Sequence, residues 1–219
     1  MHMKKRANAV SIIGGADGPT SVFVVKKNHN QTLRQKLRRF MYKMKRVYVE
    51  KTLKAESHSI DEVIEYIVNT YGFVEIAADE YIEEYDQMRA SFMLQHAPEL
   101  LGEYAEMPQL ESESPEDVQL HLKKIEERVQ KATEIPRTVF DIDFHKFKKS
   151  YDDINDNVHI LIEKNYAYIG GGASGNEKVV KEFRRIYKDV YRYYGVTQED
   201  IKMKSARYQD VVRTLSMWR

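Results

Sequence analysis

Two glycine-rich segments, each placed directly after an apolar run, constrain the fold of this chain most. The first spans residues 14–18 and lies between the apolar, β-prone runs 10–13 and 22–25. The second spans residues 170–175 and follows the alternating segment 166–169. Because glycine permits positive φ angles and close approach to the backbone, we expect both segments to be loops that end strands.

We expect the two glycine-rich loops, each of which ends a predicted strand, to meet in space and bind a ligand. Asp17 of the first loop, with nearby carbonyls, would hold a cation, and the N–H groups of the second loop would hold an anion. In the second loop, Gly170, Gly172 and Gly175 match the pattern G-x-G-x-x-G ahead of a predicted helix. Unpaired N–H groups at a helix N-terminus favour phosphate or carboxylate. A flexible turn is the alternative, and a dinucleotide site would need a strand after that helix, where another helix is predicted. The predicted ligand-binding residues are Gly14, Gly15, Asp17, Gly18, Thr20, Gly170, Gly172, Ser174, Gly175 and Asn176.

The run 13–20, Ile-Gly-Gly-Ala-Asp-Gly-Pro-Thr, resembles the signature of the β subunit of sodium-translocating decarboxylases. In that family the matching loop lies within the membrane and its Asp is associated with sodium movement, so the resemblance makes Asp17 the candidate metal ligand. A membrane span needs roughly 20 mostly apolar residues. The longest uninterrupted apolar run here is residues 22–25. The resemblance therefore predicts a shared local loop, and decarboxylase-like activity is a further alternative.

Composition favours a soluble protein with a true core. The 219 residues are 42% hydrophobic and 32% charged, which suffices for one large domain or two small ones. No apolar stretch near the N-terminus is long enough for a signal peptide. The absence of cysteine excludes disulfides, thiol catalysis and cysteine metal sites. We therefore expect a cytoplasmic protein without a transmembrane segment.

Charge is segregated along the chain. Residues 1–56 hold 14 Lys or Arg and 3 acids, whereas residues 57–118 hold 1 Arg and 16 acids. Residues 119–219 are weakly basic, with 20 Lys or Arg and 15 acids. The pattern predicts either that the first two blocks face each other or that each faces a separate partner.

The basic block contains a predicted amphipathic helix over residues 32–54. Its apolar positions follow helical spacing at Leu33, Leu37, Phe40, Met41, Met44, Val47 and Tyr48. Three readings stay open: a structural helix, a phosphate-binding nucleic-acid surface, or a helix on an anionic membrane. The predicted nucleic-acid residues are Arg34, Lys36, Arg38, Arg39, Lys43, Lys45 and Arg46.

The other local patterns indicate an α+β fold, rich in helices, with a small antiparallel sheet and the two glycine-rich loops. Residues 158–162 and 166–169 alternate as a hairpin would. Ser59 and Glu62 form a capping-box pattern at the start of a predicted helix, and Gly72 is placed to end it. Residues 102–114 form the best linker candidate, which would separate residues 1–101 from 115–219 unless the chain is one single domain. The apolar face of the last helix, which reaches toward Trp218, would either form the surface of a homo-oligomer or close the core of the monomer itself.

No complete catalytic constellation is visible, so the sequence leaves enzyme activity and any cofactor undecided. Asp141, Asp143 and His145 alternate and would share one strand face as metal ligands, or simply as a polar face. The leading functional hypothesis is a small-ligand-binding protein, for a nucleotide or phosphate-bearing compound with a cation at the glycine-rich loops. The alternative is a nucleic-acid or protein interaction module that uses the basic helix 32–54 and the acidic block 57–118.

Overall fold

The computed structural model describes residues 33–110, 112, 114–153 and 155–217. The described elements follow in the order α1 (Leu33–Thr52), β1 (Glu56–Ser57), α2 (Ile60–Tyr71), β2 (Val74–Glu75), the 3₁₀ helix η1 (Ala78–Tyr81), α3 (Ile82–His96), the 3₁₀ segment η2 (Pro98–Tyr104), α4 (Pro115–Glu134), β3 (Phe144–Lys149), β4 (Asn157–Glu163), β5 (Tyr168–Ser174), α5 (Glu177–Tyr194), β6 (Gly195–Val196), α6 (Gln198–Met203) and α7 (Ala206–Met217). The chain therefore has the helix-rich α+β fold that its sequence predicts.

The larger sheet is antiparallel throughout, in the strand order β2-β3-β4-β5. Strands β4 and β5 form the predicted hairpin, in which Ile162 lies opposite Ile169 and Leu161 opposite Gly170. The buried carboxylate of Glu163 accepts backbone hydrogen bonds from Asp143 and Tyr166, at 3.0 and 2.6 Å. This carboxylate therefore secures the hairpin turn to the chain that enters β3.

Helix α2 begins and ends where local sequence requires. Ser59 and Glu62 form a reciprocal capping box, in which each side chain accepts a backbone hydrogen bond from the other residue. Gly72 ends the helix in the left-handed conformation, with φ of 69°, and its N–H bonds the carbonyl of Val68. Both ends match the boundaries predicted from these residues.

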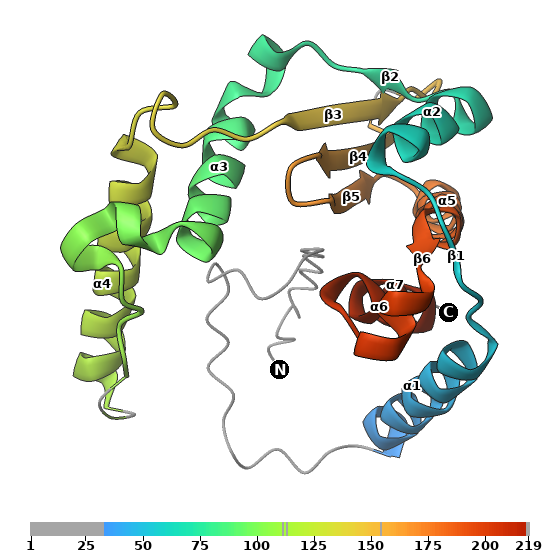
Figure 1. Cartoon of the computed structure of the whole chain (residues 1–219), viewed down its shortest axis with the longest axis horizontal. Helices are drawn as coiled ribbons and strands as arrows, with labels where there is room; N and C mark the ends of the chain where they lie inside the picture. Colours follow the sequence, from blue (N-terminus) through green and yellow to red (C-terminus); the bar gives the residue numbers. More distant parts are fainter. Residues whose placement is uncertain (1–32, 111, 113, 154, 218–219) are drawn as a thin grey trace, which may run out of the picture.

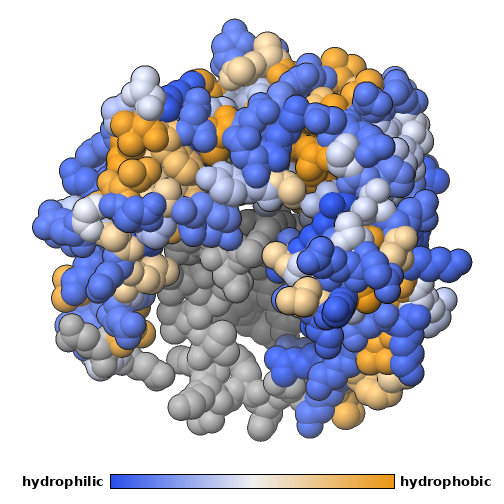
Figure 2. Space-filling model, in the orientation of Figure 1, coloured by the Kyte–Doolittle hydropathy of each residue, from blue (hydrophilic) through white to orange (hydrophobic). Residues whose placement is uncertain are grey.

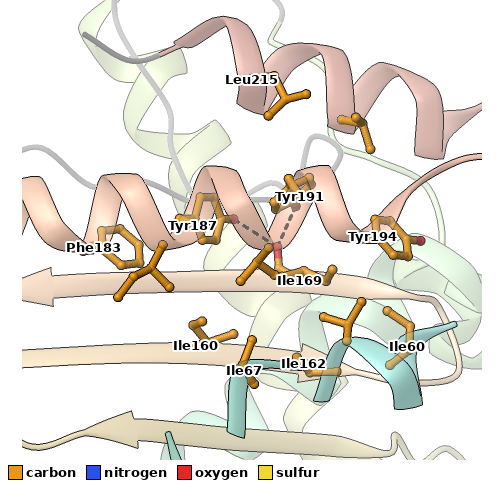
Figure 3. Close-up of a cluster of buried hydrophobic side chains, with 14 of the residues drawn as sticks. Ile60, Ile67, Ile160, Ile162, Ile169, Phe183, Tyr187, Tyr191, Tyr194 and Leu215 are labelled. Atoms are coloured by element: carbon orange, nitrogen blue, oxygen red, sulfur yellow. Dashed lines mark hydrogen bonds between the residues drawn. The ribbon is translucent and has the colours of Figure 1, made fainter. Parts of the chain in front are cut away.

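The main core lies between the larger sheet and helices α2, α5 and α7 (Figure 3). One sheet face supplies the side chains of Phe147, Ile160, Ile162 and Ile169. On the other face, Phe144 and Leu161 pack with Tyr81, Tyr85 and Phe92 from η1 and α3. A third cluster joins α3, η2 and α4. The sheet is thus covered on both faces, which explains its mostly apolar strands.

The described elements lie along an open arc (Figure 1). Helices α3 and α4 occupy one side, the larger sheet the top, and α5, α7 and α1 the other side. Both sheets join segments from the two sides of residues 102–114, because β1 pairs with β6 and β2 with β3. Whether the chain divides at 102–114 stays a prediction. None of the helices described is long and apolar enough to cross a membrane.

Candidate functional site

The second glycine-rich segment differs from its prediction, since Gly170, Gly172 and Ser174 lie inside strand β5 rather than in a loop. A Cβ on Gly170 would lie 2.5 Å from the Tyr168 hydroxyl, and one on Gly172 would lie 2.9 Å from the His159 imidazole. On the opposite face, a Cβ on Gly171 would lie 2.6 Å from the carbonyl oxygen of His159. The absence of side chains at these glycines therefore leaves room for the rings of Tyr168 and His159 and for the backbone of β4. Close packing explains why three glycines follow one another here.

The N–H groups at the start of α5 find their hydrogen-bond acceptors within the chain itself. Asn176 caps the helix, and its Oδ1 accepts hydrogen bonds from the N–H groups of Lys178 and Val179. Gly175 precedes it with φ of +125°. The carboxylate of Asp156 accepts from the backbone N–H of Asn176 at 3.0 Å and from its side chain at 2.7 Å. An internal carboxylate thus occupies the position predicted for an external anion.

The first glycine-rich loop lies outside the described residues. Its predicted ligand-binding residues are Gly14, Gly15, Asp17, Gly18 and Thr20. Convergence of the two loops, and a cation at Asp17, therefore stay predictions.

The predicted Asp141, Asp143 and His145 do not form a ligand set. Asp141 precedes β3 and accepts a hydrogen bond from the Tyr85 hydroxyl. His145 lies between two exposed carboxylates, with Nδ1 2.6 Å from Glu75 and Nε2 2.9 Å from Asp143. Across the residues the structure describes, no group of three His, Asp or Glu side chains has metal-binding geometry. The cluster is a surface contact between the imidazole of His145 and two carboxylates at the paired strands β2 and β3.

Helix α1 carries the predicted basic residues. Arg34, Lys36, Arg38, Arg39, Lys43, Lys45 and Arg46 all lie on it, and the helix holds eight Lys or Arg and a single acid, Glu50. Arg46 pairs with Glu50 one turn away, at 2.8 Å. Among the described side chains, no ion pair joins α1 to the acidic block 57–118. That block instead pairs with Lys146, Lys164 and Arg137. Within the described residues, the acidic block is thus paired with cations that follow it in the sequence rather than with α1.

One side of α1 holds the helix on the protein. Tyr42, Lys45 and Val49, at spacings of three and four, are its half-buried or buried positions and face α7. Val49 is the α1 residue in the main core, where it joins Tyr208, Val211 and Leu215 of α7. Burial, together with the neighbouring ammonium of Lys45, lowers the pKa of Lys188 on α5 to about 8. Two ammonium groups, those of Lys45 and Lys188, thus lie close together between α1 and α5.

The opposite side of α1 is apolar and faces solvent. Positions at 100° per residue place 33, 37, 40, 44 and 47 in one stripe, roughly opposite 42 and 49. We call the following residues the α1 stripe: Leu33, Leu37, Phe40, Met41, Met44, Val47 and Tyr48. Their exposed fractions range from 43% to 85%. Figure 2 shows apolar side chains on the surface over α1, at the lower right of the view.

The sequence pattern predicted the apolar periodicity of the α1 stripe but not its exposure. A contiguous exposed apolar patch of this extent is typical of an interaction surface. The spacing of 33, 37, 40, 44 and 47 alternates four and three, which is the heptad spacing of a helix that pairs with another helix. Searches of known protein families, curated proteins and solved structures found no match for this chain.

Proposed function

We propose that this chain is a protein-interaction module that binds an acidic, amphipathic surface through α1. One observation carries the proposal: the apolar residues of α1 face solvent, on the side opposite to the residues that pack on α7. A surface helix of a globular protein normally turns its apolar stripe to its own core. The α1 stripe therefore has the chemistry of a contact made with another molecule.

The charges on α1 define the kind of partner. Lys36 and Lys43 are exposed and lie along one edge of the α1 stripe. Apolar contacts would supply most of the binding free energy, at roughly 25 cal/mol per Å² of apolar area removed from water. The flanking cations would select acidic partners and speed association. A partner helix with an apolar stripe and Asp or Glu at its edges fits both properties.

A nucleic acid fits the same helix less well. Phosphate recognition uses cations at the centre of the contact. On α1 the centre of the exposed side is occupied by Leu37, Phe40 and Met44. Lys36 and Lys43 lie at its edge, and one cation, Lys51, continues the central line in the last turn. This arrangement supports protein binding over phosphate binding.

The test uses the full chain and a fluorescent synthetic peptide as long as α1, with Leu at heptad core positions and Glu at the flanking positions. We expect the Leu37→Ser/Met44→Ser variant to raise the Kd for this peptide by about 10-fold or more, since each truncation removes part of an apolar contact. The control is Met203→Ser, which changes an exposed methionine on α6. Because all three residues are exposed, the melting temperatures should stay close to that of the wild type.

The same titration with duplex RNA separates the two partner classes. The proposal is wrong if the peptide binds wild type and the Leu37→Ser/Met44→Ser variant equally well. It is also wrong if duplex RNA binds more tightly than the peptide and only Lys36→Glu/Lys43→Glu weakens it, because α1 would then be a phosphate-binding helix.

A further inference from the structure

A second exposed surface of this chain has the opposite charge and also carries apolar side chains. Residues 90–122 contain seven acids and no Lys or Arg. Glu103, Glu106, Met107, Leu110 and Leu120 are exposed, and we call these five residues the acidic surface. Two glutamates and three large apolar side chains are therefore exposed on η2, the segment that follows it and the first half of α4.

The chain around the acidic surface is held against α4. The guanidinium of Arg128 on α4 is buried and donates hydrogen bonds to the carbonyls of Tyr104 and Ala105, at 2.7 and 2.8 Å. Its Nη1 also lies 3.6 Å from the sulfur of Met107. Gln109 and Leu120 line the same small cavity. These contacts hold residues 104–110 against the side of α4. The backbone under the acidic surface is therefore already in place before any partner binds.

The two surfaces are opposite in charge. Helix α1 has eight cations and one acid, against the seven acids and no cation of residues 90–122. Figure 1 shows α1 and α4 on opposite sides of the arc, so one chain does not bring them together.

We infer that the α1 stripe of one copy of this chain binds the acidic surface of a second copy. The inference rests on the proposed function and names the partner of α1. The contact is heterologous, since each copy contributes a different surface. Repetition of a heterologous contact gives either a closed ring or an open chain of copies.

Pairing of α1 with α1 of another copy is disfavoured by charge. Such a pair would place two helices of eight cations and one acid side by side, and like charges at the edges of paired helices oppose association. Contact with the acidic surface replaces this repulsion by attraction between opposite charges.

Sedimentation velocity of the full-length protein tests the inference with two charge-reversed variants. Leu37→Glu/Lys43→Glu disables the α1 stripe, and Glu103→Lys/Glu106→Lys disables the acidic surface. We expect the wild type to form species larger than a dimer as its concentration rises at low salt, and to dissociate at high salt. Each variant alone should stay monomeric. An equimolar mixture should form a one-to-one dimer and nothing larger, because only one pair of intact surfaces remains.

Matched controls and the remaining outcomes make the test decisive. The control variants Lys202→Glu and Glu65→Lys reverse exposed charges on α6 and α2, outside both surfaces, and should associate as the wild type does. A wild type that stays monomeric at low salt overturns the inference. Self-association of Glu103→Lys/Glu106→Lys at the wild-type level also overturns it, since another pairing would be responsible. A monomeric wild type that still binds the acidic peptide through α1 leaves the proposed function standing.

Discussion

Tyr187 and Tyr191, one helical turn apart on α5, donate hydrogen bonds to the same acceptor, the carbonyl oxygen of Ile169. The distances are 3.0 and 2.8 Å, and all three residues are buried (Figure 3). Ile169 lies on β5, one of the two edge strands of the larger sheet. The two hydroxyl groups therefore fix α5 to this edge, in the part of the core that also receives α7.

This shared acceptor predicts a non-additive pair of substitutions. Tyr187→Phe or Tyr191→Phe alone should lower the free energy of unfolding by about 1 kcal/mol, because the carbonyl keeps the other hydroxyl as a donor. The double variant removes both donors and should lose more than the sum of the two single losses. Urea unfolding of the four proteins measures the interaction. If the two losses of unfolding free energy simply add, the carbonyl of Ile169 does not need either hydroxyl as its donor, and the prediction is wrong.

The glycines of β5 predict a ranking of alanine variants. Gly171→Ala should be destabilising by roughly 2–3 kcal/mol, because its Cβ would meet the backbone carbonyl of His159, which cannot move independently of β4. Gly172→Ala should cost less, since its Cβ would meet only the His159 side chain. Thermal or urea unfolding gives the order. The opposite order would contradict the packing explanation of this glycine run.

Local patterns predicted those parts of the fold that short stretches of chain determine. Ser59 and Glu62 cap α2 through each other, and Gly72 ends it through its own backbone conformation. The hairpin of β4 and β5 follows from alternation on either side of a short turn. These features depend on residues within one element, so sequence alone was sufficient.

The position of the candidate site depends on residues that are distant in sequence. Gly170 and Gly172 belong to a strand because they pair with Leu161 and His159 of β4, and no local rule identifies these partners. Similarly, periodicity located the apolar residues of α1, but packing of Val49 on α7 decided which side faces solvent. The predicted residues of the first glycine-rich loop lie outside the described residues and stay predictions.

Arg207 on α7 connects the segments at His58 and Gly195, and we predict that lysine cannot replace it there. Its guanidinium donates to the carbonyls of Gly195 and His58, at 2.9 and 2.8 Å, and lies 3.8 Å from the centre of the Tyr194 ring. Lysine has no planar fork to bridge several carbonyls. Arg207→Lys should therefore lower the free energy of unfolding by roughly 1–3 kcal/mol. The control Arg192→Lys changes an exposed arginine on α5 and should have an effect below about 0.5 kcal/mol.

Replacement of Lys188 by an uncharged residue should stabilise the protein by an amount that depends on pH. Burial and the neighbouring Lys45 lower its pKa from 10.5 to about 8. Below pH 8 the lysine is charged in both the folded and the unfolded chain, so the folded state bears the full cost of that charge. Between pH 8 and 10.5 the unfolded chain holds the proton more tightly, so the cost fades as the pH rises.

Lys188→Met should therefore be more stable than the wild type at pH 7, by about 1 kcal/mol once solvent screening of this half-buried group is considered. The difference should shrink as the pH rises from 8 toward 10.5. Urea unfolding of both proteins across this range measures it, and Lys181→Met, on the exposed side of α5, is the control that should show no such trend. A gain from Lys188→Met that is equal at pH 7 and pH 10 would exclude charge burial beside Lys45 as its cause, because only the titration of Lys188 makes the gain depend on pH.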